Sequence, residues 1–203
     1  GRGEERAAAL RSAVRAEEHY HPEVQAFFDT IVRTAPEAVI VGDSTRPTYY
    51  AAWQLERSRP RAYFHSASGF GTLGYALPAA FGAALGGSAP VIGLIGDGGI
   101  QFTLPELSTA AELELPVPII IWHNHGYREI ENSMRAKNVP VDSTRIEAPD
   151  FAAVAMAHGA HHARPESLND LSAVLADALA ARAPTLIEVH EDDFLTTPSG
   201  GWY

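Results

Sequence analysis

Two polar residues that follow apolar runs carry the clearest chemical signal in this chain. Asp97 lies in Gly-Asp-Gly-Gly directly after the apolar run 91–95, and Asn124 comes shortly after the apolar run 118–121. Short runs rich in β-branched residues that end in turn residues are typical of buried parallel strands. The two side-chain oxygens would then meet at the carboxyl edge of a sheet, where open α/β sheets bind ligands. Carboxylate and amide oxygens suit Mg²⁺, so the pair predicts a magnesium site.

The glycines after Asp97 predict a phosphate-binding site next to the metal. Gly98 and Gly99 have no side chain, so their backbone N–H groups can approach a phosphate closely. Because protein-bound Mg²⁺ usually keeps phosphate oxygens among its ligands, the motif predicts a magnesium-diphosphate site. The residues alone leave an alternative open, in which Gly-Asp-Gly is an ordinary strand-to-helix turn and Asn124 caps a helix.

Gly96-Asp97-Gly98 with Asn124 resembles the cofactor signature of thiamine diphosphate-dependent enzymes. In that signature Gly-Asp-Gly is followed, one helical segment later, by Asn, usually as Asn-Asn. His123 stands where the first Asn would be. The resemblance places the metal on the second Asn, so Asn124 keeps this role, and the departure at His123 affects only the surroundings of the metal.

The same resemblance assigns roles to the residues that follow Asn124. It implies that Mg²⁺ is bound by Asp97, Asn124 and the backbone carbonyl of Gly126. It also implies that the N–H of Tyr127 lies near the diphosphate. Ile130, one helical turn after Gly126, would face the thiazolium ring of the cofactor.

A loop nearer the N-terminus is expected at the same sheet edge. Ser44, Thr45 and Arg46 follow the apolar run 38–41, and their hydroxyl and guanidinium groups can hydrogen-bond to phosphate. Taken alone, these residues could equally cap the next helix. The resemblance places them on the diphosphate.

Residues 68–80 form a glycine-rich loop and the start of a helix of small residues. On their own, these glycines are explained by tight helix packing. The segment nevertheless resembles, nearly residue for residue, the corresponding loop of acetolactate synthases and related 2-oxo acid decarboxylases. This implies that the loop with Thr72 binds the cofactor and that the carbonyl of Gly71 accepts a hydrogen bond from its aminopyrimidine ring. Leu73 would wedge under the cofactor and force its bent shape.

Apolar runs alternate with helical patterns along the chain. The patterns predict strands at 38–41, 62–64, 91–95, 118–121, 160–163 and 185–189, and helices at 22–34, 48–56, 75–87, 104–115, from 127 onward, 150–158 and 167–182. This alternation predicts a doubly wound α/β fold, with a mostly parallel sheet and helices on both faces. It agrees with the thiamin diphosphate-binding fold that the resemblance implies. The span 137–149 has no periodic pattern and is interpreted as a mobile loop.

Composition predicts one ordinary globular domain. The chain has 203 residues, of which 46% are hydrophobic and 20% charged, and it shows neither a signal peptide nor a membrane-spanning run. A formal net charge of −10 argues against binding to nucleic acid. The absence of cysteine fits a reducing cytoplasm, where we expect the protein.

We divide the chain into three parts. Residues 1–20 are expected to be a linker helix from a preceding domain, residues 21–190 the thiamine diphosphate-binding domain, and residues 191–203 a tail that can fold over the site. The first residue is Gly rather than Met, which suggests an excised domain or a cleaved tag. A separate natural subunit remains the alternative.

The resemblance covers almost the whole chain but only about a third of a typical enzyme of this family. There the activating glutamate lies in a separate N-terminal, pyrimidine-binding domain, and nothing in this chain matches that domain. We therefore expect no certain catalytic residue here and no activity from this chain alone. The expected partners are such a domain or subunit, a small-molecule 2-oxo acid, and further copies in a homo-oligomer, a dimer or a tetramer.

The predicted function is that of the diphosphate-binding part of a 2-oxo acid decarboxylase. Segments 42–45 and 126–130 resemble decarboxylases that act on the 2-oxo acid of arginine, 5-guanidino-2-oxopentanoate. A carboxylate aimed into the pocket would favour such a cationic substrate, and Glu129 is our candidate. Its alternative is an exposed helix residue paired with Arg128. Three other acids lie close to the predicted site or in the tail: Glu131, Asp192 and Asp193.

Two other functions stay open at this point. The first is a carboligase of the acetolactate synthase type, which uses the same cofactor and joins two oxo acids. The second is a non-enzymatic α/β module that binds phosphate through Gly98 and Gly99. The chain lacks the P-loop motif and the strand-turn Gly-x-Gly-x-x-Gly, the two commonest nucleotide fingerprints.

Overall fold

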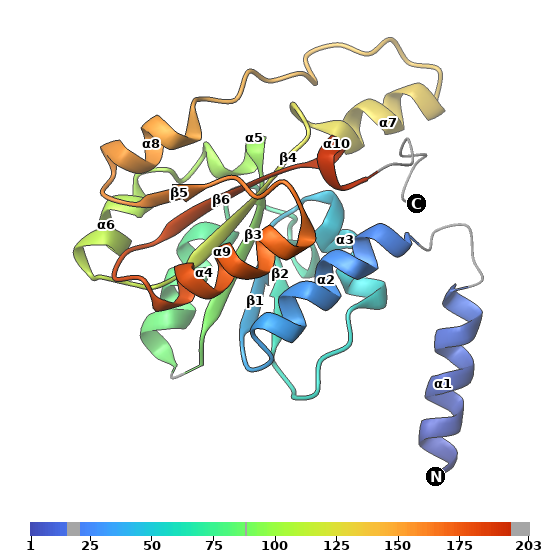
Figure 1. Ribbon diagram of the computed structural model, residues 1–203. Coiled ribbons are helices and arrows are strands. Elements are labelled where there is room, and N and C mark those ends of the chain that lie inside the picture. Colours follow the sequence, from blue (N-terminus) through green and yellow to red (C-terminus); the bar gives the residue numbers. More distant parts are fainter. Residues whose placement is uncertain (16–20, 88, 196–203) are drawn as a thin grey trace.

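The computed structural model describes residues 1–15, 21–87 and 89–195, and within them it contains one six-stranded parallel sheet (Figure 1). The strand order is β2-β1-β3-β4-β6-β5, and every neighbouring pair is parallel. The strands are β1 (Val39–Gly42), β2 (Tyr63–His65), β3 (Val91–Gly96), β4 (Pro118–His123), β5 (His161–Ala163) and β6 (Thr185–His190). The expected doubly wound α/β fold is confirmed, and all six strands lie where the sequence places them, within two residues at each end.

The central strands are apolar because both of their faces are covered. All six residues of β4 are buried, as are the first five of β3. A strand buried on both sides cannot alternate polar and apolar residues, which is why these segments read as continuous apolar runs.

Two apolar cores lie on opposite faces of the sheet. One is built against α2 (Pro22–Thr34), α3 (Arg46–Gln54) and α9 (Leu168–Ala180), and the other against α4 (Ala76–Gly86), α6 (Glu106–Glu112) and α8 (Phe151–Ala157). In α2, for example, the side chains buried against the sheet recur at helical spacing: Val24, Phe27, Phe28 and Ile31. The helices therefore sandwich the sheet, as Figure 1 shows.

Several helices begin or end differently from the prediction. Helix α3 starts at Arg46 instead of residue 48, because Pro47 fits the first turn of a helix. The helix expected at 104–115 is the shorter α6, whose N-cap is Pro105. Proline has no backbone N–H and disrupts the interior of a helix, so the helix begins after this residue. A separate four-residue helix, α5 (Asp97–Ile100), begins at Asp97 itself.

Four further helical elements complete the described part of the chain. They are α1 (Arg2–Arg15), the short 3₁₀ helix η1 (Ser66–Ser68), α7 (Arg128–Ala136) and α10 (Glu191–Phe194). Helix α1 stands apart from the sandwich in Figure 1, and its Arg11 forms an ion pair of 3.3 Å with Glu56. Every described helix is too short or too polar for a membrane span. Most of the expected tail, residues 196–203, lies outside the described residues.

The strand order creates a switch point between β1 and β3. The chain leaves β1 through α3 to reach β2 on one side, then returns through α4 to β3 on the other side of β1. The loops that follow β1 and β3 consequently run in opposite directions and leave a crevice between them, which is where open α/β sheets bind ligands.

Candidate active site at the carboxyl edge of the sheet

A cavity of about 490 Å³ opens at this switch point. It lies among the loops after β1, β3 and β4 and the glycine-rich loop before α4. The predicted site residues that line it are Ser44, Thr45, Arg46, Gly71, Leu73, Asp97, Gly98, Gly99, Asn124, Gly126, Tyr127, Glu129 and Ile130. The structure therefore brings the loops together as expected. Thr72 is exposed and is absent from the described lining.

The carboxylate of Asp97 is buried and held by backbone N–H groups from two loops. Gly98 N donates to Oδ1 at 2.9 Å and Gly126 N donates to Oδ2 at 3.0 Å, while the residue is 2% exposed. Burial raises the pKa of Asp97, and the nearby His123 and the backbone donors oppose this rise. Each oxygen keeps a free lone pair after these bonds, so the carboxylate can still bind a cation.

Asn124 is oriented by a glutamate that the sequence analysis did not single out. Its Nδ2 donates to Oε2 of Glu191 at 3.1 Å, and Trp122 Nε1 donates to the same oxygen at 2.6 Å. Because the amide nitrogen is committed to Glu191, the amide oxygen of Asn124 is the atom left for a metal. Asn124 does not cap the following helix, whose N-cap is Tyr127.

Glu191, the first residue of the expected tail 191–203, begins α10 directly after β6. This residue is 5% exposed and also pairs with Arg46 beneath the cavity. A signal existed in the sequence, because Glu191 directly follows the last strand and so belongs to the same sheet edge as Asp97. Asp192 and Asp193 are exposed, and Asp193 pairs with Arg164 at 3.2 Å.

Arg46 occupies a buried position between two carboxylates. Its side chain is 1% exposed, its Nε lies 2.8 Å from Oε1 of Glu129, and its Nη1 pairs with Glu191. Burial lowers the pKa of Arg46, and the charges of Glu191 and Glu129 oppose this. The guanidinium that we expected to reach a phosphate thus links the start of α3 to α7 and α10.

The alternative for Glu129 was an exposed helix residue paired with Arg128, and the structure shows a different arrangement. Its side chain is 18% exposed, lies in the cavity wall, and forms its ion pair with Arg46. Burial raises the pKa of Glu129, and Arg46 counters this effect. Glu131, by contrast, is bound by Arg135 at 2.7 Å outside the described cavity wall.

The loop after β4, residues 124–127, contacts the irregular span 137–149. Tyr127 N donates to the carbonyl of Thr144 at 2.8 Å, and Gly126 forms an isolated antiparallel bridge with Arg145. Gly126 has a φ of +131°, and a side chain there would clash with the carbonyl oxygen of Thr144. The turn therefore requires glycine. Gly126 lines the cavity together with Asp97 and Asn124, and its carbonyl accepts from Arg128 N at 3.1 Å.

The glycine-rich loop is tied to the loop after β1. Ser44 Oγ donates to the carbonyl of Gly71 at 3.0 Å and lies 2.9 Å from Ser66 Oγ. Buried Asp43, which the sequence analysis passed over, accepts from Ala76 N at 2.9 Å and from Ser44 N at 2.8 Å. Asp43 therefore fixes the start of α4 against the β1 loop.

Two alternatives for these loops can now be compared with the geometry. Thr45 is the N-cap of α3, but its side chain makes no capping hydrogen bond. Leu73 is half-buried in the cavity wall, and it belongs to neither described apolar core. Thr45 is therefore not needed as a side-chain cap, and Leu73 is not part of an apolar core.

Comparison with known proteins identifies the family. Residues 41–189 match the family described as thiamine pyrophosphate enzyme, C-terminal TPP binding domain. The chain belongs to this family. The match spans most of the chain and contains the cavity loops from Ser44 to Glu129, so the expected cofactor, thiamine diphosphate, is supported by the family as well as by the motifs.

Relatives of this thiamine pyrophosphate-binding domain include decarboxylases and synthases. A probable 2-ketoarginine decarboxylase of Pseudomonas aeruginosa is 34% identical over 91% of this chain and 34% of its own length. Benzoylformate decarboxylase of the same organism is 38% identical over 80% of this chain and 31% of its own length. The acetolactate synthase large subunit of Parasynechococcus marenigrum is 33% identical over 77% of this chain and 26% of its own length.

Solved structures agree with this placement. A thiamine diphosphate-dependent 4-hydroxybenzoylformate decarboxylase of Rhodococcus jostii RHA1 superposes with a TM-score of 0.74 at 34% identity, over 83% of this chain and 32% of that one. Benzoylformate decarboxylase of Polynucleobacter necessarius gives a TM-score of 0.73 at 25% identity, over 91% and 35%. The chain thus spans about a third of the length of the relatives it matches.

Proposed function

We propose that this domain binds thiamine diphosphate through Mg²⁺ and contributes half of the active site of a 2-oxo acid decarboxylase. The observation that carries the proposal is the convergence of Asp97, Asn124 and Gly126 on one cavity at the switch point of the sheet. These three residues offer a carboxylate, an amide and a backbone oxygen, the ligand types that Mg²⁺ prefers. Their orientation by Glu191 and by backbone N–H groups is already set without the ion.

The residues around the metal ligands fit a diphosphate and a bent cofactor. Gly98 and Gly99 follow Asp97 in α5, and Ser44 and Thr45 line the same cavity. The cofactor, when bound, supplies the electron sink for cleavage of the carbon–carbon bond next to the ketone.

Apolar residues complete the wall of the proposed cofactor cavity. Leu73 supports the bend of the cofactor, and Ile130, which is half exposed at the cavity rim, faces its reactive ring. The carbonyl of Gly71, which keeps a second lone pair beside its bond to Ser44, accepts from the pyrimidine end. Tyr127 also lines the cavity, and Thr72 lies between Gly71 and Leu73 outside this lining; we include both in the proposed cofactor-binding set.

For the substrate we propose a 2-oxo acid with a distal cation, such as 5-guanidino-2-oxopentanoate. Glu129 lines the cavity, and with Glu191 it surrounds a single guanidinium, that of Arg46, so these three side chains carry one excess negative charge. The similarity to a probable 2-ketoarginine decarboxylase supports the same substrate. The second candidate, an acetolactate synthase-type carboligase, is supported by a relative of that name at 33% identity.

The proposal includes a second domain or subunit that supplies the pyrimidine-binding half. Phe70, Phe102 and Ile130 are large apolar residues, at least half exposed, close to the cavity. A covering domain, in a homodimer or homotetramer, would bury them. The cytoplasmic location and the inactivity of this chain alone stay predictions.

The cofactor is tested by thermal unfolding. We expect thiamine diphosphate with Mg²⁺ to raise the melting temperature, and ATP or NAD to leave it unchanged. Asp97→Ala should abolish the shift, with Asp192→Ala, an exposed acid outside the cavity, as the matched control. A folded Asp97→Ala variant with an undiminished, Mg²⁺-dependent shift would contradict the metal assignment.

The substrate is tested separately on the enzyme with both halves of its site. We expect kcat/KM to favour 5-guanidino-2-oxopentanoate over pyruvate. A preference for pyruvate with acetolactate as the product would instead support the carboligase, while leaving the cofactor assignment intact.

A further inference from the structure

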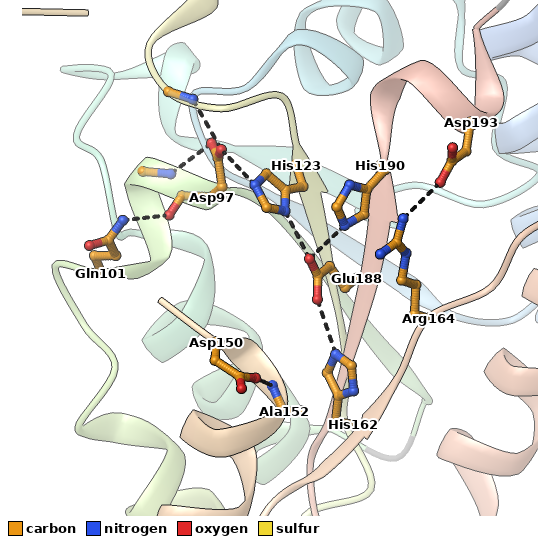
Figure 2. Close-up of polar contacts among 12 residues, drawn as sticks. Asp97, Gln101, His123, Asp150, Ala152, His162, Arg164, Glu188, His190 and Asp193 are labelled. Carbon is orange, nitrogen blue, oxygen red and sulfur yellow. Dashed lines mark hydrogen bonds and ion pairs between the residues drawn. The ribbon is translucent and has the colours of Figure 1, made fainter. Parts of the chain in front are cut away.

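A second cluster of possible metal ligands lies beside the proposed magnesium site. Figure 2 shows the side chains of His123, His162 and His190 directed at the carboxylate of Glu188. His123 Nδ1 lies 2.8 Å and His190 Nε2 lies 2.6 Å from Oε1, and His162 Nε2 lies 3.2 Å from Oε2. The four side chains are 10–21% exposed, so this is a largely buried cluster.

Strand periodicity and register build this cluster on one face of the sheet. Glu188 and His190 are two residues apart on β6, so their side chains point the same way. In the parallel register His123 of β4 pairs with His190, and His162 of β5 pairs with Leu186. Three neighbouring strands therefore present their polar side chains to one point.

We propose that His123, His190 and Glu188 form a binding site for a divalent transition-metal ion such as Zn²⁺. Their ligand atoms lie within 4.8 Å of one another. Zn²⁺ binds imidazole nitrogen at about 2.0–2.1 Å and carboxylate oxygen at about 2.0–2.2 Å, so an ion fits between these atoms after small shifts. Two imidazoles and one carboxylate are ligands that suit such ions better than Mg²⁺.

Other side chains contact the three proposed ligands and orient them, as is usual around metal sites. His162 holds Oε2 of Glu188, which leaves Oε1 for the ion. The other ring nitrogen of His123, Nε2, is directed at Asp97 and lies 3.7 Å from Oδ2. Metal-binding histidines commonly direct their second nitrogen at a carboxylate in this way.

Charge also favours a cation at this point. In the described part of the chain, no lysine or arginine pairs with Glu188, whose contacts come from the three imidazoles. The site thus offers a negative oxygen and two nitrogens, with a fourth coordination position open to water.

The test is metal binding by the chelator-treated protein in the absence of thiamine diphosphate. We expect one equivalent of Zn²⁺ by calorimetry and a visible absorption spectrum with Co²⁺, both unaffected by excess Mg²⁺. His190→Ala should abolish binding, and His162→Ala should weaken it about 10–100-fold as an outer-shell partner. His161→Ala is the matched control. His161 is the exposed neighbour of His162 on β5, so this variant should bind Zn²⁺ as tightly as the wild type.

Two further measurements keep the test decisive. Asp97→Ala should remove the Mg²⁺-dependent effect of thiamine diphosphate and, like His162→Ala, weaken but not abolish binding of Zn²⁺ or Co²⁺, so failure of one site is distinguishable from failure of the other. His190→Gln, with folding checked by circular dichroism, replaces His190→Ala if the latter unfolds. Zn²⁺ binding that is absent from the wild type, or equal in the wild type and a folded His190 variant, would overturn the proposal and leave a hydrogen-bond cluster only.

Discussion

At the scale of single residues, buried charged groups organise the site. Glu191 accepts hydrogen bonds from Arg46, Trp122 and Asn124, and all four residues are buried. A buried ion pair is worth little in net stability, but the loss of one partner is costly because the other charge is left behind. Glu191 therefore couples the stability of the domain to the orientation of a proposed metal ligand.

We expect Glu191→Ala to lower the free energy of unfolding by about 3–5 kcal/mol, the range for a broken buried ion pair. Denaturant unfolding measures this value. Glu191→Gln tests the positioning role, because it retains an acceptor for Asn124 while removing the charge. Its Mg²⁺ requirement for thiamine diphosphate binding should lie between those of the wild type and Glu191→Ala. Equal metal requirements in all three folded proteins would leave Glu191 with a structural role alone.

Leu73 permits a prediction that separates cofactor geometry from packing. We expect Leu73→Ala to lower the turnover of the complete enzyme while changing the affinity for thiamine diphosphate little. A core leucine would cost about 2–5 kcal/mol of stability on truncation to Ala, whereas half-buried Leu73 should cost less. Leu77, which is fully buried in α4, is the comparison. A large loss of stability in Leu73→Ala with normal turnover would contradict the wedge.

Among the larger elements, the contact between the loop after β4 and the span 137–149 determines one wall of the proposed site. The bonds of Tyr127 to Thr144 and the bridge of Gly126 to Arg145 join segments that share no regular element. Ile146 also packs close to Gly98, where an added Cβ would lie 2.9 Å from its Cδ1. The span thus closes one side of the proposed diphosphate site.

We expect Gly126→Ala to separate these segments, since the residue has a positive φ and its Cβ would clash with Thr144. The variant should lose at least about 1 kcal/mol of stability and bind Mg²⁺ with thiamine diphosphate more weakly. Gly82→Ala in α4 is the control, because nothing lies within 4 Å of its Cβ. A helical Gly→Ala change should stabilise by roughly 0.5–1 kcal/mol. Unchanged cofactor binding in Gly126→Ala would show that the contact between these segments is dispensable.

At the scale of the whole molecule, the parallel sheet gathers charge from distant segments at one edge. Glu188 shows the consequence for stability, because its pKa is lowered to about 2 in the folded protein from the usual 4.5. A carboxylate with a lowered pKa stabilises the fold fully above its unfolded pKa. This contribution is lost as the pH falls from about 4.5 to about 2.

We therefore expect metal-free wild type to exceed Glu188→Gln in stability by up to about 3 kcal/mol near neutral pH. The difference should shrink as the pH falls through this window. Urea unfolding of both proteins across the pH range, with a chelator present, measures it. A difference that stays constant from pH 7 to the acid limit of folding would show that the charge of Glu188 is not its source.

Local signals in the sequence were sufficient to predict the fold class and the strands, and they indicated the residues of the proposed magnesium-diphosphate site. Apolar runs, turn glycines and the spacing of Asp97 and Asn124 are local signals, and parallel strands must bring their carboxyl ends to one edge. The family resemblance to thiamine diphosphate enzymes rested on the same residues and was confirmed by the match over residues 41–189.

The partners of the charged groups, in contrast, become visible only when the chain is packed. Arg46 and Glu191 are 145 positions apart. The place of Glu191 directly after the last strand puts it at the sheet edge, but it does not show that the residue pairs with Arg46 and orients Asn124. The cluster around Glu188 likewise needs the register of β4, β5 and β6, because a slip of one residue would turn His123 or Glu188 to the opposite face. Strand periodicity fixes the face of each side chain, but only the packed sheet fixes its neighbours.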